Sequence, residues 1–321
     1  MNEKTTYLSK ETCTMMRGIA AIVIVLHHTV NYVSLGSILD FILKNIGASM
    51  TTIFFFYSGY GLMLSKNKKK DYMEQFLKRR IPSILLPYLI VNVVYIAVSW
   101  ALGEKISVLQ RCRELAKGKT IVPFSWYVIV IFLLYLCFYI SFRWLKAKQG
   151  VGLCVLLNIG YIVAAYQIGF DEYWYNTAFA FSVGLLYAYA FDRIDPLVRK
   201  HPFLGAVLSL GMFFVLFAMG KLWNGSCLVI LIKSLRSAAF CMIVLYASMV
   251  LTKRIRLFQW LGERSFELYL YQGVAFMLLN FFGVQRYAII YVIGELAVTG
   301  ILAFVFQKVD ARLLKFTRNL K

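Results

Sequence analysis

The feature that most constrains this chain is a series of long apolar runs, each able to cross about 30 Å of hydrocarbon as a helix. Hydrophobic residues make up 60% of the 321 positions, whereas soluble domains average roughly 45–50%. Because the excess is concentrated in runs, many membrane spans are favoured over one large soluble core. We therefore predict an all-α polytopic membrane protein with about ten spans, near residues 15–34, 46–64, 82–102, 124–143, 151–169, 173–191, 202–220, 228–251, 266–283 and 287–306.

The chain is strongly basic, with a formal charge of +20. Most of its 35 lysines and arginines fall in the breaks between apolar runs, as loop topology signals do, so we expect no nucleic-acid partner. Placing both termini in the cytoplasm puts most of these residues on the cytoplasmic side. Residues 103–123 would then lie outside, either as an interfacial helix or facing an anionic substrate. This segment nevertheless holds five basic residues: Lys105, Arg111, Arg113, Lys117 and Lys119.

The rest of the sequence indicates a single membrane domain over residues 1–321, with no internal repeat and no appended soluble domain. The six cysteines are scattered without metal-ligand spacing, so we predict no metal site. The first apolar run lacks a small-residue cleavage site and is predicted to be an uncleaved span.

The first run contains ionisable residues at a depth where lipid offers no water. Arg17 and His28 are eleven residues apart, which is close to three turns at about 100° per residue, so both lie on one helix face. The His27 side chain points about 100° around the helix axis from that of His28. An ionisable group inside a span usually marks function, which makes His28 a candidate. A histidine hydrogen-bonded between helices is the alternative.

Four more ionisable residues fall within predicted spans. Lys233 and Arg236 share a helix face and could reach the outer surface with their long side chains. Glu267 and Glu295 must either pair or protonate in lipid. An ion pair with Lys233 or Arg236 is as compatible with the sequence as a catalytic role.

Two motifs within the predicted spans have a structural explanation that does not require a binding site. Ser58 lies beside Gly59 and Gly61, and glycines let a second helix approach closely. Trp126 and Tyr127 open the fourth span, where an aromatic belt at the membrane surface is the default explanation.

A basic cluster directly precedes the third span, which we expect to begin at Ile81 and Pro82. A helix N-terminus beside three cations suits a phosphorylated ligand. A plain topology signal explains the cluster equally well. Its members are Lys78, Arg79 and Arg80.

In order along the chain, these motifs resemble those of the acyltransferase-3 family of integral-membrane O-acyltransferases. The Arg17–His28 spacing resembles the family's opening Arg-x10-His motif. Residues 55–60 resemble its second-span Phe-Phe-x-Ser-Gly-aromatic stretch, and residues 76–88 resemble the basic start of its third span. Residues 125–127 and 261–272 resemble its Trp-aromatic and Gly-x-x-Ser-aromatic-x-x-Tyr-Leu motifs.

The chain differs from the family pattern at three positions. Thr14 stands where the family often has aspartate, and Gln272 stands where it often has histidine. A second arginine often follows the family's basic cluster; here its position is taken by Ile84, or the arginine is displaced. The first two differences leave His28 without an obvious acidic neighbour or a second histidine, which argues against a two-histidine scheme.

The resemblance implies transfer of an acyl group, often acetyl from acetyl-CoA, to a hydroxyl of a cell-surface or lipid-linked carbohydrate. Acyl-CoA would be a co-substrate, and the protein would be a multi-pass protein of the cell membrane, here a bacterial cytoplasmic membrane. His28 would be the general base, because a neutral imidazole can accept the hydroxyl proton. His27 could hold the tautomer of His28, receive the acyl group, or simply pack. The other candidates are Arg17, Lys78, Arg79 and Arg80 for the CoA donor, Glu267 for proton handling, and Ser58, Trp126 and Arg236 for the acceptor.

Two other classes of protein remain compatible with these observations. A proton-coupled transporter or flippase for an envelope glycan precursor would also have many spans and intramembrane charges, although the chain lacks repeated halves. A non-catalytic scaffold would not need an Arg–His face.

Overall fold

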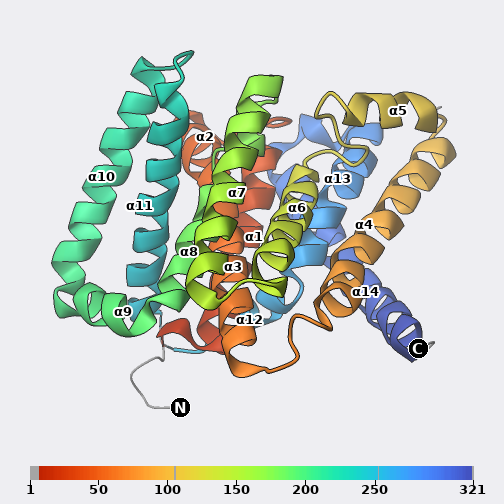
Figure 1. The fold of residues 1–321 in the computed structure, drawn as a ribbon. Coiled ribbons are helices and arrows are strands. Elements are labelled where there is room, and N and C mark those ends of the chain that lie inside the picture. Colours follow the sequence, from red (N-terminus) through yellow and green to blue (C-terminus); the bar gives the residue numbers. More distant parts are fainter. Residues whose placement is uncertain (1–6, 105, 252, 320–321) are drawn as a thin grey trace. The chain divides into compact units, whose positions relative to one another are not determined.

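The computed structural model describes residues 7–104, 106–251 and 253–319. Over these ranges the chain is helical with short connections and no strand, which confirms the all-α class (Figure 1). In the described residues, eight stretches are long and apolar enough to cross a membrane, so this is a multi-pass membrane protein. They are α1 (Lys10–Thr29), the α2–α3 stretch (Ser37–Lys68), α4 (Phe76–Ala101), α6 (Trp126–Arg143), α7 (Ala147–Ile168), α10 (Pro202–Leu222), α11 (Leu228–Val250) and α14 (Ala288–Asn319).

The two other predicted spans coincide with shorter helices. The first is α8 (Phe179–Tyr189), with 11 residues, and the second is α13 (Ser265–Phe281), with 17. A straight span needs about 20 residues, so ten spans and cytoplasmic termini remain predictions. Residues 1–6 and 320–321, at the two ends, lie outside the described ranges, as does Lys105.

Three short helices connect the longer ones: α5 (Val108–Leu115), α9 (Phe191–Lys200) and α12 (Arg256–Glu263). α2 itself covers Ser37–Ile46, and α3 covers Thr51–Lys68. The chain divides into two compact units, each assembled from separated segments. The first contains residues up to 16, 51–77 and 133–254, and the second contains residues 17–50, 78–132 and those from 255 onward.

In the first unit, α3 and α8 cross at two glycines. A Cβ on Gly59 would overlap the carbonyl oxygen of Phe181, and a Cβ on Gly184 would lie 2.9 Å from the Phe56 carbonyl carbon. A Cβ on Gly61, in contrast, would meet no atom within 4 Å outside its own helix backbone. The packing interpretation of the second span is therefore confirmed for Gly59 and not for Gly61.

The same unit contains the paired helices α10 and α11, which lie side by side in Figure 1. Lys233 of α11 is buried and forms an ion pair with Glu172, which lies in the connection between α7 and α8. Arg236 lies over the ring of Phe217 at 5.7 Å. Lys233 thus has an acidic partner and Arg236 an aromatic one, and neither partner is Glu267 or Glu295, which the sequence had offered.

In the second unit, α1 packs on the backbone of α12. A Cβ on Gly18 would lie 2.8 Å from the Gly262 nitrogen and would overlap the Phe258 carbonyl oxygen. α13 and α14 form an antiparallel pair, with the Tyr271 ring stacked on the Phe306 ring at 4.4 Å. Glycine at position 18 is therefore required for the approach of α12 beside Arg17.

The third span begins earlier than its sequence predicted. α4 starts at Phe76, so Pro82 and Pro87 lie inside the helix and not at its first turn. A proline has no amide hydrogen, and Pro82 therefore leaves the carbonyl four residues before it without its helical donor. The prediction that Pro82 marks the helix start was wrong, because the basic residues before it are themselves helical.

Candidate functional site

His28 lies in the last turn of α1 and is 9% exposed. Its ring stacks on the Phe124 ring, with centroids 3.8 Å apart and planes inclined by 18°. Among the described residues, neither ring nitrogen of His28 takes part in a hydrogen bond. A buried imidazole with unengaged nitrogens can take a proton from a substrate group.

His27 has a different environment, although its ring centroid is only 4.7 Å from that of His28. Its Nδ1 lies 2.8 Å from the Leu43 carbonyl oxygen in α2. A carbonyl only accepts, so Nδ1 carries the hydrogen and donates it. Gly47 completes the contact, since a Cβ there would lie 2.6 Å from the His27 Cβ. This geometry favours packing among the roles considered for His27.

Phe124 belongs to a strained segment, residues 122–127, that we call the Phe124 turn. Its φ of 68° makes it the one non-glycine residue with positive φ in the described part of the chain. For a bulky side chain this conformation costs about 1–3 kcal/mol and persists only where neighbours hold it. The Tyr269 hydroxyl does so by donating to the Phe124 carbonyl and accepting from the Tyr127 amide at 3.2 Å.

Within the second unit, an aromatic cluster adjoins the Phe124 turn. Phe276 lies edge-on to Phe124, with ring centroids 6.0 Å apart, and stacks on Tyr32 at 4.8 Å. Tyr291 joins this cluster and donates its hydroxyl hydrogen to Asn280 Oδ1 at 2.8 Å. One side of the His28 neighbourhood is therefore built from large, closely packed rings.

Glu295 lies one helical turn after Tyr291 in α14 and is fully buried. Its Oε1 accepts a hydrogen bond from Thr299 at 2.8 Å, while Oε2 has no partner among the residues described. The partner of Glu295 is thus a hydroxyl of its own helix. Its remaining oxygen is able to accept a further donor.

Glu267 lies in the first turn of α13 and is half-buried. The charged side chains of Asp310 and Arg264 interact electrostatically with the Glu267 carboxylate. Asp310 is 2% exposed, and both its carboxylate oxygens lack a hydrogen-bond partner within the described ranges. The sequence analysis did not identify Asp310, because a single aspartate near the end of a long helix resembles an ordinary surface residue.

Arg17 lies within α1 on the same face as His28 and next to the contact between Gly18 and α12. At about 1.5 Å per residue, the two positions are roughly 16 Å apart along the helix. Since one continuous helix carries both residues, this separation is fixed. The shared face predicted from their spacing is confirmed by the helix over Lys10–Thr29.

The basic cluster occupies the first turns of α4. Lys78 and Arg79 are exposed, and Arg80 is half-buried. The Arg80 carbonyl accepts a hydrogen bond from the Ser83 hydroxyl at 2.7 Å. These cations lie beside a helix N-terminus, where unpaired amides and the helix dipole favour anions.

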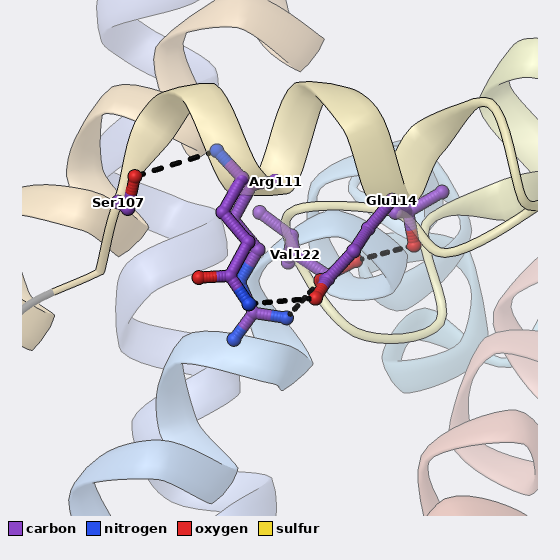
Figure 2. Close-up of polar contacts among 6 residues, drawn as sticks. Ser107, Arg111, Glu114 and Val122 are labelled. Carbon is purple, nitrogen blue, oxygen red and sulfur yellow. Dashed lines mark hydrogen bonds and ion pairs between the residues drawn. The ribbon is translucent and has the colours of Figure 1, made fainter.

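The basic segment 103–123, which is predicted to lie outside despite its positive charge, contains α5. None of the residues of α5 is buried. Figure 2 shows its first turn and the ion pair between Arg111 and Glu114, in which Arg111 Nη1 lies 2.9 Å from Glu114 Oε2. The helical form of this segment agrees with one of its two interpretations. Contact with an anionic substrate stays a prediction.

The three predicted acceptor residues fall in different places. Trp126 is buried, lies two residues after Phe124 and packs edge-on against Tyr127. Ser58 and Arg236 belong to the first unit. The second unit thus brings Trp126 close to the His28–Phe124 stack.

The family model described as an acyltransferase domain, that of acyltransferase-3, matches residues 14–306 of this chain. The chain belongs to the acyltransferase-3 family. No curated protein and no solved structure matches it. The match includes α1 with Arg17 and His28 and extends into α14, which confirms the resemblance found in the sequence motifs and supports acyltransferase activity.

The sequence did not reveal the roles of Phe124, which stacks on the base candidate His28, and of Tyr269, which contacts the backbone of the Phe124 turn. Tyr269 lies within a family-like motif and Phe124 directly precedes another, but no sequence pattern signals a phenylalanine with positive φ. A tyrosine in an apolar helix resembles a packing residue until its hydroxyl partners are known. The proline at 123 was the only local sign of a sharp turn.

Proposed function

We propose that this acyltransferase moves an acyl group, acetyl in the simplest case, from acyl-CoA to a hydroxyl of a cell-surface or lipid-linked carbohydrate in a bacterial cytoplasmic membrane. The observation that carries the proposal is the buried His28 imidazole, whose nitrogens have no hydrogen-bond partner in the described chain. Family membership supports acyl transfer, and the chemistry of such a transfer requires a base at the acceptor hydroxyl.

In the proposed reaction, a His28 nitrogen takes the proton from the acceptor hydroxyl. The hydroxyl oxygen attacks the thioester carbonyl carbon at the same time. The carbon–sulfur bond then breaks, and the CoA thiolate leaves. The imidazolium proton passes to the thiolate, directly or through solvent, so that the products are an ester and CoA thiol. The base is neutral again and no proton is gained or lost overall.

Arg17 is proposed to bind the donor and not the reacting carbonyl. Its position roughly 16 Å along the helix from His28 places it too far from the base to touch the same carbonyl group. That separation suits an extended pantetheine arm whose thioester reaches the base. The half-buried guanidinium supplies donors for a phosphate or an amide of this arm.

The charged nucleotide end of CoA is proposed to bind at the start of α4. Lys78 and Arg79 are exposed there, and arginine binds phosphate with two parallel hydrogen bonds. For the acceptor, we propose Trp126 of the second unit as a sugar contact, and separately Ser58 and Arg236 of the first unit. Glu267 is proposed to handle protons.

The test is transfer of radiolabelled acetyl from acetyl-CoA to candidate glycan acceptors by purified protein in lipid. His28→Ala should lower the rate about 10²–10⁴-fold, the usual contribution of a general base. His201→Ala is the matched control, because His201 is exposed and remote in sequence from the motifs. Parental transfer by His28→Ala would show that another group is the base. Uptake of glycan into proteoliposomes without any transfer would favour the transporter class instead.

A further inference from the structure

The side chain of Tyr269 in α13 contacts the backbone of the Phe124 turn. This side chain is 5% exposed, and its hydroxyl bridges two backbone groups of the turn. It donates to the carbonyl of Phe124 and accepts from the amide of Tyr127. A single hydroxyl thus engages the backbone on both sides of the residue with positive φ.

The next turn of α13 makes a second contact with the same segment. A Cβ on Gly273 would lie 2.9 Å from Val122 Cγ1 and 3.2 Å from the Pro123 carbonyl oxygen. Within the turn, the Ser125 hydroxyl donates to the Val122 carbonyl at 2.8 Å. The helix therefore lies directly against the turn, which leaves the Tyr269 hydroxyl little freedom to move away.

The conformation of Phe124 decides where its ring points. Changing φ from positive to negative moves the Cβ to the other side of the backbone, because the chirality of the residue is fixed. The observed φ of 68° directs the ring onto the His28 imidazole, which it covers on one face. The contact between Tyr269 and the Phe124 backbone is therefore linked to the orientation of His28.

From this geometry we infer that Tyr269 is a positioning residue for acyl transfer: its hydroxyl holds the Phe124 turn, and the Phe124 ring in turn fixes the plane of the His28 imidazole. The inference rests on the proposed role of His28 as the base. Tyr269 touches no reacting atom, so its effect passes through Phe124. A misplaced base lowers the rate of the chemical step without weakening donor binding elsewhere.

The experiment compares Tyr269→Phe with a matched control, Tyr271→Phe. Tyr271 is a fully buried tyrosine of the same helix, and its hydroxyl has no partner in the described structure. Tyr269→Phe should lower kcat by about ten- to a hundredfold, with KM for acyl-CoA unchanged, because two hydrogen bonds to the turn are lost. Tyr271→Phe should keep parental kcat. Equal losses in both variants would overturn the inference.

A second variant tests whether Tyr269 acts through Phe124. Phe124→Ala removes the stacked ring, and its kcat should fall at least as far as that of Tyr269→Phe. Combining the two substitutions should give no further loss, because the hydroxyl then has no ring left to position. Additive losses would contradict the linkage. Folding of each variant is checked by a monodisperse profile in detergent, and Phe124→Ala alone still tests the stack if Tyr269→Phe does not fold.

The His28→Ala variant separates failure of the inference from failure of the proposed function. If His28→Ala is inactive while Tyr269→Phe has parental kcat, only the positioning role of Tyr269 is wrong. If His28→Ala retains parental activity, the base assignment itself is wrong, and the positioning role falls with it.

Discussion

Replacing Gly184 by alanine should separate α3 from α8, and the structure allows the effect to be estimated. A Cβ at this position would lie 2.9 Å from the Phe56 carbonyl carbon, 3.0 Å from the Tyr60 nitrogen, and closer still to the Phe56 oxygen. Real Cβ atoms essentially never approach within 3.0 Å of another heavy atom. All these atoms belong to the backbone, so the helices must move apart by about 1 Å, and overpacking of this kind costs about 1–3 kcal/mol.

The helix-forming preference of alanine offsets only part of this cost. Gly→Ala in a helix interior contributes about 1 kcal/mol of stability where space allows. Gly61→Ala provides the matched control, because no atom outside its own helix backbone lies within 4 Å of the added methyl group and α3 carries both Gly59 and Gly61. We therefore expect Gly61→Ala to leave stability unchanged or slightly higher, and Gly59→Ala to behave like Gly184→Ala.

The assay is thermal unfolding of the purified protein in one detergent, with each variant measured beside the parent. A loss of about 1–3 kcal/mol should lower Tm by several degrees in a chain of this size. The double variant Gly59→Ala with Gly184→Ala should lose less than the sum of the single losses, because both methyl groups force apart the same crossing. Equal Tm values for Gly61→Ala and Gly184→Ala would refute the packing argument.

Two further predictions concern donor binding. Gly18→Ala should raise KM for acyl-CoA several-fold with a smaller change in kcat, since the methyl group pushes α12 away beside Arg17; unchanged steady-state kinetics would disconnect this contact from the donor. Arg79→Ala combined with Arg80→Ala should raise KM for acyl-CoA by about tenfold and weaken its salt dependence. If the KM of this variant equals that of the parent, the basic start of α4 is a topology signal alone.

The sequence was sufficient to predict those features for which a pattern allows only one structure. Apolar runs of span length must form helices in lipid, and eight of the ten predicted positions agree with long apolar stretches in the described residues. The eleven-residue spacing of Arg17 and His28 was sufficient to place both on one face. Family membership followed from the order of the motifs and agrees with the match over residues 14–306.

The sequence was insufficient where the outcome depends on a partner far away in the chain. Gly59 and Gly61 look alike in sequence, yet only Gly59 contacts a crossing helix, because α8 approaches one face of α3. The basic cluster and Pro82 suggested a helix start, but α4 begins at Phe76 and includes these residues. The residues that position His28 could not be identified from its neighbours in the sequence. Phe124 and Tyr269 both lie in segments that are far from it in the chain.

One pair of consecutive helices supports both ends of the Arg17–His28 face. The backbone of α12 lies against Gly18, next to Arg17, and α13 carries the hydroxyl that holds the turn stacked on His28. Because α12 ends at Glu263 and α13 begins at Ser265, a displacement of either helix is transmitted to the other. A rigid α1 fixes the spacing between the proposed donor contact and the proposed base, and the α12–α13 pair fixes what surrounds each of them. Such an arrangement favours a preorganised site, in which binding of the donor at one end leaves little rearrangement to be made at the other.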